Sequence, residues 1–307
     1  MERLTHDQAL PERFRAGIVA LGNFDGFHLG HQAVVGRAVG RGHHERRPVI
    51  VATFDPHPVR FFKPDVPPFR LTSLAQRERL FAHAGADAML VFRFDAALAA
   101  TSADDFVTQL LARQIGAAGV VTGDDFTFGQ GRAGNVEVLK RLGLKVGIDA
   151  EAVAPVLLEG KRISSGLIRE ALEAGDPGTA TRLLSRPFAV EGVVERGDGR
   201  GHDLGFPTAN LHLGDYQRPA YGIYAGRVRL DDEREFAAVI SLGVRPTFQP
   251  PIELLEAHLF DFDEDLYGRA IEVALHAFIR PEEKFAKVQA LAARMKEDEA
   301  EARRLLA

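Results

Sequence analysis

The 307-residue chain has no cysteine, and only seven of its 38 basic residues are lysine. The lack of cysteine excludes disulfide bonds, cysteine nucleophiles and thiolate metal sites. A bound metal ion would therefore need oxygen or imidazole ligands. Because lysine is scarce, arginine, histidine, backbone amides or a metal must make most contacts to any phosphate.

Long apolar runs are also missing. The polar N-terminus has no apolar core of the kind that a signal peptide needs, and no run approaches the ~20 residues of a membrane span. The 38 basic and 43 acidic residues give a net charge of −5, which offers no general attraction to nucleic acid. We therefore expect a cytoplasmic protein with small-molecule partners and no nucleic-acid or membrane partner. The sequence does not indicate the oligomeric state.

The first part of the chain alternates short apolar runs with helical patterns up to about residue 184. This alternation predicts an α/β domain with a Rossmann-like parallel sheet and covering helices. Ligands of such folds bind beyond the carboxyl ends of the strands. The predicted strands are residues 17–22, 48–54, 87–92, 118–123 and 152–157.

The remainder of the chain has extended segments punctuated by Gly and Pro, which predict a small antiparallel β-barrel. Its expected strands are residues 188–197, 208–213, 221–230, 235–243, 252–260 and 270–279. From Pro281 onward the pattern predicts a C-terminal helix with an apolar stripe formed by Phe285, Val288, Ala292 and Met295. Because a chain of this length usually forms two cores, we expect domains at 1–185 and 186–307.

The first predicted strand runs into the segment NFDGFHLGH, which contains His28 and His31 and is followed at once by a helical pattern. Gly22 and Gly30 would let the backbone approach a ligand closely. A helix N-terminus at this point favours phosphate, and two imidazoles could donate hydrogen bonds as negative charge develops. Two alternatives are ordinary turn histidines, and a divalent-metal site completed by Asp25.

Three further polar segments are candidates for ligand contact, namely residues 53–58 (TFDPHP), 123–134 (GDDFTFGQGRAG) and 162–172 (RISSGLIREAL), and the first two are predicted at the same sheet edge. The second contains a G-x-G-x-x-G pattern but follows the fourth strand, so we interpret it as a flexible loop that covers a ligand. The third places two serines at a helix start, where they could bind phosphate or serve as common helix caps.

The segment GHDLGFPTAN predicts a second phosphate site. Thr208 and Asn210 point to the same face of an extended chain, and their oxygens suit Mg²⁺ bound to nucleotide phosphates. Gly201 lies in a pliable loop that could close over those phosphates. Taken alone, a Thr and an Asn near a turn are structural more often than not.

Glu256 shares a predicted strand face with apolar residues, among them Leu254 and Phe260. A carboxylate in such surroundings can act as a general base toward an alcohol. The alternative is a salt bridge to a nearby arginine.

The ordered motifs GNFDGFHLGH, TFDPHP, GDDFTFG and ISSGLIR resemble the FMN adenylyltransferase module of bacterial bifunctional riboflavin kinase/FAD synthetases. The first motif is the H-x-G-H signature of nucleotidylyltransferases, whose histidines serve the ATP phosphates. The residues that the resemblance implies are His28 and His31 for catalysis, Gly22, Gly30, Ser164, Ser165 and Arg169 for ATP, and Asn23, Asp125 and Phe128 for the flavin.

The motifs GFPTAN, RPTF, EAHL, DLYG and IRPEEKF resemble the riboflavin kinase module of the same family, in the same order. This resemblance implies Thr208 and Asn210 as ligands of Mg²⁺·ATP and Glu256 as the base that deprotonates the ribityl 5′-hydroxyl. It also implies that Gly201 lies near the phosphates and that Arg280 contacts the flavin.

The implied activity is bifunctional: riboflavin and ATP give FMN, and FMN and ATP then give FAD and pyrophosphate. Two positions depart from the family pattern, because Gly166 replaces a threonine and Ser241 an asparagine. Three alternatives remain open. They are a riboflavin kinase without adenylyl transfer, a nucleotidylyltransferase with another acceptor, and a binding protein that senses flavin or nucleotide without turnover.

Overall fold

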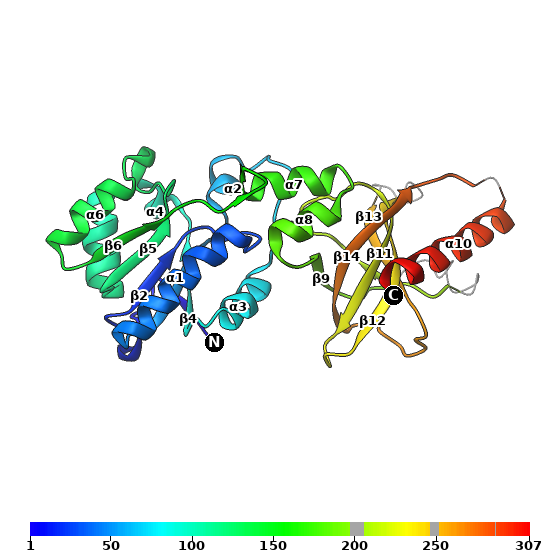
Figure 1. Ribbon diagram of the computed structural model, residues 1–307, viewed down its shortest axis with the longest axis horizontal. Helices are drawn as coiled ribbons and strands as arrows, with labels where there is room; N and C mark the ends of the chain where they lie inside the picture. The colour runs from blue at the N-terminus through cyan, green and yellow to red at the C-terminus, as the bar shows by residue number, and fades with distance from the viewer. Residues whose placement is uncertain (197–205, 246–251, 286) are drawn as a thin grey trace. The chain divides into compact units, whose positions relative to one another are not determined.

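The computed structural model describes the whole chain except residues 197–205, 246–251 and 286. The chain forms two compact units (Figure 1). The first unit comprises Met1–Pro67 and Leu74–Ser164, and the second comprises Pro68–Ser73 and Ser165–Ala307. The assignment of one activity to each side of residue 185 stays a prediction.

The first unit contains a six-stranded parallel sheet with the order β1-β4-β3-β2-β5-β6. This confirms the predicted Rossmann-like architecture. The strands are β1 (Glu2–Thr5), β2 (Ile18–Leu21), β3 (Val49–Asp55), β4 (Ala88–Arg93), β5 (Gly119–Gly123) and β6 (Asp149–Val153).

Helices cover both faces of this sheet, because alternate strand residues project to opposite sides. Ile18 and Ala20 pack with residues of α1 and α3, whereas Val19 and Leu21 pack with residues of η2 and α6. The helices are α1 (Leu29–Glu45), α2 (Pro58–Phe62), α3 (Leu74–His83), α4 (Ala96–Ala100), α5 (Ala103–Asp105) with its continuation η2 (Phe106–Ile115), and α6 (Val136–Lys145); the minor elements are η1 (Glu12–Phe14), η3 (Gln130–Arg132), β7 (Leu157–Leu158) and β8 (Lys161–Arg162).

The sequence pattern missed one strand of this sheet and misplaced another. The sequence pattern missed β1, because the segment ERLT has a single apolar residue and gives no clear alternation. It also placed a strand at 152–157, whereas β6 pairs with β5 through Asp149–Val153. Pro155 explains the shift, since proline has no N–H to donate to a sheet.

The second unit contains a six-stranded antiparallel sheet with the order β10-β13-β12-β11-β14-β9. Its edge strands meet where the N–H of Glu195 donates to the carbonyl of Asn210 at 3.0 Å, which curls the sheet toward the predicted barrel. The strands are β9 (Phe188–Val193), β10 (Ala209–Leu211), β11 (Gly222–Leu230), β12 (Glu235–Arg245), β13 (Ile252–Leu259) and β14 (Ala270–Pro281).

The C-terminal helix α10 (Val288–Leu306) packs on one face of this sheet, where Ala302 contacts Ala225 and Phe260. The helix was predicted, but its start and its apolar stripe were wrong. Pro281 ends β14, because the backbone there pairs with β11 as far as Gly222. Val288 is 59% exposed, and the buried helix positions are Asp298 and Ala302.

Two parts of the chain outside the barrel belong to the second unit. Helices α7 (Ser165–Glu173) and α8 (Pro177–Leu184) pack on it, and the N–H of Ala220 donates to the carbonyl of Leu172 at 2.9 Å. The segment 68–73 pairs with the barrel unit in a strand-like manner. The backbone N–H of Arg70 donates to the carbonyl of Asp215 at 2.9 Å, and the carbonyl of Arg70 accepts the backbone N–H of Gln217 at 2.7 Å.

Candidate active sites

The first candidate site lies at the carboxyl edge of the parallel sheet, beside the central strand β2. The chain proceeds from β2 through β3 to β4 on one side, and β5 and β6 lie on the other side. The strand order therefore reverses at β2, which is where open α/β sheets bind ligands. The loops after β2, β3 and β5 all emerge at this edge.

His28 and His31 lie together at the start of α1. His28 is the N-cap, and its Nδ1 accepts the N–H of His31 at 3.3 Å. Their rings stack with centroids 3.6 Å apart. Because Nδ1 of His28 accepts a hydrogen bond, the neutral ring carries its proton on Nε2, which is a donor for an anionic ligand.

Gly30 allows this close arrangement. A Cβ at position 30 would lie 3.1 Å from Cε1 and 3.2 Å from Nδ1 of His28, so a side chain there would push the imidazole away. The first turn of α1 also contains no acidic residue that would repel an anion from the positive helix end. Gly22, which ends the β2 region, lies against the ring of Phe24, where an added Cβ would approach to 3.1 Å.

The two predicted residues after β5 lie at the same sheet edge but have protein partners. The carboxylate of Asp125 lies 3.0 Å from the guanidinium of Arg162. Phe128 is buried, and its ring lies 5.3 Å from that of Phe106. Two backbone hydrogen bonds between Phe128 and Gly134 close the loop, at 2.9 and 3.0 Å. A flavin contact by the Phe128 ring would therefore require this loop to open, and the contact stays a prediction.

The predicted ATP contacts of the ISSGLIR segment are divided between the two units. Ser164 ends the first unit, whereas Ser165 and Arg169 lie on α7 in the second. The Arg169 guanidinium packs over the ring of Phe69 and donates from Nε to the Phe69 carbonyl at 2.8 Å. Roles for these three residues in ATP binding stay predictions.

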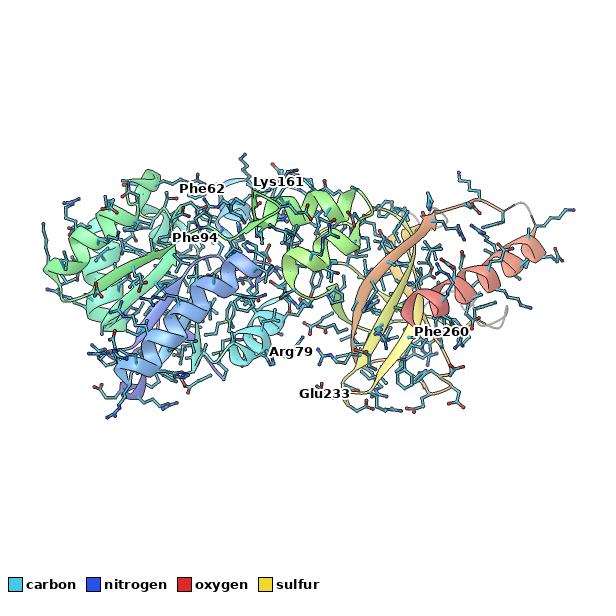
Figure 2. The ribbon with its side chains drawn as sticks, in the orientation of Figure 1. Phe62, Arg79, Phe94, Lys161, Glu233 and Phe260 are labelled. Atoms are coloured by element: carbon cyan, nitrogen blue, oxygen red, sulfur yellow. The ribbon has the colours of Figure 1, made fainter. Side chains whose placement is uncertain are left out.

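An aromatic cluster at the carboxyl edge was missed by the sequence analysis. Phe61 and Phe62 end α2, and Phe94 follows β4, with ring centroids 5.2 to 5.7 Å apart. Figure 2 labels Phe62 and Phe94. Phe62 is 65% exposed, which is unusual for a large apolar side chain. The adjacent phenylalanines after TFDPHP were the available signal, because nothing in the pattern buries both of them.

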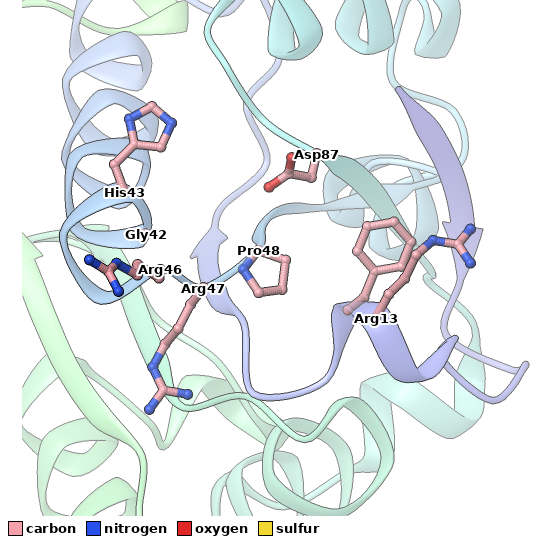
Figure 3. Close-up of a pocket in the computed structure, with 8 residues that line it drawn as sticks. Arg13, Gly42, His43, Arg46, Arg47, Pro48 and Asp87 are labelled. Atoms are coloured by element: carbon pink, nitrogen blue, oxygen red, sulfur yellow. The ribbon is translucent and has the colours of Figure 1, made fainter.

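A shallow pocket of about 600 Å³ lies at the opposite, amino edge of the sheet. It is lined by Arg13, Phe14, Gly42, His43, Arg46, Arg47, Pro48 and Asp87 (Figure 3). The pocket adjoins the C-terminal end of α1, whereas His28 caps its N-terminal end. It therefore lies apart from the residues predicted to handle phosphate.

The second candidate site is a row of side chains across the antiparallel sheet. Glu256 on β13 lies directly opposite Asn210 on β10 and, on its other side, directly opposite Ser241 on β12. Directly paired residues project to the same face of a sheet, with Cβ atoms about 5 Å apart. The structure therefore brings together the predicted base and one predicted metal ligand, 46 residues apart in sequence.

The segment that carries Thr208 is fixed to the same strand. Nδ1 of His258 lies 2.8 Å from the carbonyl oxygen of Pro207, and the His258 ring packs edge-on against Phe206. Thr208 is half-buried and lies two residues before Asn210, which is buried. Gly201, the fourth predicted residue of this site, lies outside the described residues.

Arg280 continues the row toward α10. It pairs with Ile223, the neighbour of Ser241, and its guanidinium is buried. Nε and Nη2 donate to the two carboxylate oxygens of Asp298 at 2.8 and 2.7 Å. This bidentate pair holds α10 to the sheet face that carries Glu256, and a flavin contact by Arg280 stays a prediction.

Asp298→Asn is expected to destabilise the second unit by about 3–5 kcal/mol, because it removes the only buried carboxylate among the described ion-pair partners of Arg280 and leaves the more distant, half-exposed Glu283 at 3.7 Å. Urea unfolding measures the change in the free energy of unfolding, and hydrogen exchange of the native protein shows whether α10 is the part that is destabilised. Glu297→Gln is the matched control, since that carboxylate is 65% exposed and its loss should cost less than about 1 kcal/mol. Equal stability of the two variants would contradict the anchoring role of the pair.

The described part of the chain bears on two of the alternatives. Within those residues, no three His, Asp or Glu side chains are grouped so that they could hold a metal ion, so the metal site of Asp25, His28 and His31 has no geometric support. None of the described helices combines the length and apolar character that a membrane crossing requires.

Comparisons with known proteins match both parts of the chain. A FAD synthetase family model matches residues 10–167, and a riboflavin kinase family model matches residues 184–306. The chain is 39% identical, over 93% of its length and 91% of the relative, to the bifunctional riboflavin kinase/FMN adenylyltransferase of Escherichia coli strain K12. The corresponding protein of Pseudomonas fluorescens is 38% identical over 95% and 94% of the two chains. The chain belongs to the bifunctional riboflavin kinase/FMN adenylyltransferase family.

Membership of this family confirms the two predicted activities, riboflavin kinase and FMN adenylyltransferase. A solved structure from Streptococcus pneumoniae, described as a macrolide-efflux protein, is 30% identical to this family member over 99% of both chains, with a TM-score of 0.88. That similarity shows that both folds of the bifunctional enzyme occur together in another single chain.

Proposed function

We propose that adenylyl transfer takes place at the His28 loop. A phosphate oxygen of FMN attacks the α-phosphorus of ATP, the bond to the β-phosphate breaks, and pyrophosphate leaves. The observation that carries this proposal is the His28–His31 pair at the N-terminus of α1, where Nε2 of His28 can donate to the phosphate oxygens as charge develops. Asn23 and Asp125 are proposed to contact the flavin.

We propose that riboflavin phosphorylation takes place at the row formed by Asn210 and Glu256. The carboxylate of Glu256 takes the proton of the ribityl 5′-hydroxyl, whose oxygen forms a bond to the γ-phosphorus of ATP as ADP leaves. The cross-strand pairing of Asn210 with Glu256 supports this assignment, because it places a neutral oxygen ligand beside the base.

The oxygen donors of Thr208 and Asn210 fit Mg²⁺, which prefers hard oxygen ligands and keeps other positions for water and phosphate. Bound there with the nucleotide, the ion would neutralise phosphate charge. The protein residues then orient the hydroxyl and accept its proton. Phosphoryl transfer needs mainly such positioning and charge neutralisation, so a small set of side chains is sufficient.

Incubation of the protein with riboflavin, ATP and Mg²⁺, followed by separation of the flavins, tests both proposals. Accumulation of FMN and then FAD is expected, and chelation of Mg²⁺ should stop FMN formation. FMN without FAD would indicate a kinase whose adenylyl step is inactive, with Gly166 as the first position to examine. Absence of both products would refute the two assignments.

Phe62 is proposed to bind the isoalloxazine ring of FMN in the adenylyl step, because an exposed aromatic ring at the ligand edge suits stacking. Phe62→Ala should raise the KM for FMN about 10-fold, which corresponds to the loss of one aromatic stacking contact. Phe62→Tyr should retain the wild-type KM. The control is Leu144→Ala on α6, a 75% exposed apolar residue elsewhere in the same unit. An unchanged KM in Phe62→Ala would exclude the stacking role.

Two broader features are also proposed. Adenylyl transfer belongs to residues 1–185 and phosphorylation to residues 186–307, in agreement with the two family-model matches. The cytoplasm is the proposed location, because both reactions consume ATP, and fractionation of cells followed by immunoblotting would check this.

A further inference from the structure

Arg77 on α3 is one of the largest side chains that are almost completely buried in the first unit, at 2% exposure. Phe24, Phe27 and Phe81 belong to the apolar core on the side of the sheet that α1 and α3 cover. A buried guanidinium is costly to desolvate and is retained where it makes specific hydrogen bonds. The contacts of Arg77 therefore indicate what it does.

Nη1 of Arg77 donates to the hydroxyl of Thr53 at 2.9 Å and to the backbone carbonyl of Asn23 at 3.3 Å. The Thr53 hydroxyl in turn donates to the same carbonyl at 2.7 Å. Thr53 is completely buried in β3, whereas Asn23 is exposed at the carboxyl edge. The Arg77 guanidinium and the Thr53 hydroxyl thus both bind the Asn23 carbonyl from inside the core, although Asn23 itself is exposed at the carboxyl edge of the sheet.

The Asn23 carbonyl lies at the start of a turn whose backbone conformation is energetically unfavourable. Phe24 and Phe27 have φ angles of 50° and 44°, in the left-handed region that side chains other than glycine rarely occupy. Such strain persists only where the surrounding structure fixes it. The rings of both phenylalanines pack on Phe81, which anchors the side chains, and Arg77 anchors the backbone immediately before them.

We propose that Arg77 is a positioning residue for adenylyl transfer. Together with Thr53, it fixes the start of the turn that ends at His28. It thereby keeps the imidazoles of His28 and His31 in the position from which they can donate to the ATP phosphates. This inference rests on the proposed role of His28 and His31. It predicts that loss of the Arg77 contact lowers the rate of adenylyl transfer although Arg77 touches no substrate.

The test measures kcat and KM for FAD formation from supplied FMN, together with the riboflavin kinase rate of the same preparation. Arg77→Met should lower the adenylyl kcat by roughly 10- to 100-fold, the size of effect that a small displacement of catalytic groups produces. Arg77→Lys should lie between Arg77→Met and wild type. The matched control is Arg79→Met, the same change at an exposed position two residues further along α3.

Substitutions of Thr53 test the same proposal independently, because they leave the buried charge of Arg77 in place. Thr53→Val should lower the adenylyl kcat in the same way, Thr53→Ser should restore it, and the double variant with Arg77→Met should be no slower than the slower single variant. The kinase rate should stay unchanged in all of these proteins.

Wild-type adenylyl kcat in folded Arg77→Met or Thr53→Val protein would overturn the proposal, as would a loss of folded protein with normal kcat per active site. If Arg77→Met does not fold, Thr53→Val and Thr53→Ser decide. Failure of the underlying assignment has a different signature, since a His28 and His31 double variant would then retain adenylyl transfer.

Discussion

Replacement of Glu256 by glutamine is expected to lower FMN formation by about 10²- to 10⁴-fold, the contribution of a positioned general base. The change keeps the shape of the side chain and its place opposite Asn210 and Ser241, but it removes the group that accepts the hydroxyl proton. FAD formation from supplied FMN should continue at the wild-type rate. Separation of riboflavin, FMN and FAD after incubation with ATP and Mg²⁺ measures both rates in one protein.

Glu253→Gln is the matched control for this experiment. Glu253 lies on the same strand, but its carboxylate is bonded to Arg218 at 2.6 Å and to the hydroxyl of Tyr221. Burial raises the pKa of Glu253, but these partners outweigh that effect and hold the pKa below its ordinary value. The carboxylate therefore stays ionised and bonded to Arg218 and Tyr221. A Glu256→Gln protein as fast as this control would refute the role of Glu256 as the base.

Replacement of both His28 and His31 by alanine should produce the opposite pattern. FAD formation from FMN is expected to fall by at least about 10³-fold, since each hydrogen-bond donor to a developing charge contributes roughly 10²-fold or more. The riboflavin kinase rate should remain unchanged. Both FAD and released pyrophosphate should be measured. Pyrophosphate without FAD would show that ATP is still cleaved but that the adenylyl group does not reach FMN.

His28 also caps α1, and this structural role must be separated from the chemical one. Alanine at an N-cap costs about 1 kcal/mol, whereas asparagine caps well and lacks the Nε2 donor. His28→Asn should therefore keep the stability of the unit and still lose most adenylyl transfer. The control for the double change is His43→Ala with His44→Ala, two exposed histidines at the other end of the same helix. Loss of activity in that control would point to a general disturbance of α1.

The parts of the fold that local patterns determine could be predicted from the sequence. Runs such as residues 48–54 and 118–123 are apolar because both faces of a parallel strand are covered, and they form β3 and β5. The N-terminal strand β1 could not be predicted in this way, since its place depends on pairing with β4. The limits of α10 depend on how far β14 pairs with β11 and on a buried charged residue, Asp298, which an apolar pattern cannot include.

The candidate sites show the same division. Thr208, Asn210 and Glu256 were each predicted as site residues from their chemistry and from family motifs, but the register that places Asn210 opposite Glu256 is a long-range property of the sheet. Arg77 was not found, because the polar segment LAQRER resembles a solvent-facing helix and arginine is rarely buried. Its role depends on a carbonyl 54 residues earlier in the chain.

The short segment 68–73 has a consequence for separating the two activities genetically. Its residues are joined to the first unit at both ends but pair with Asp215 and Gln217 of the second, so the chain passes from one unit to the other three times. A gene divided at any single codon therefore cannot encode two complete units. A fragment ending at residue 164 would retain six residues of the other unit, which gives the two halves of a divided gene product a built-in means of reassociation.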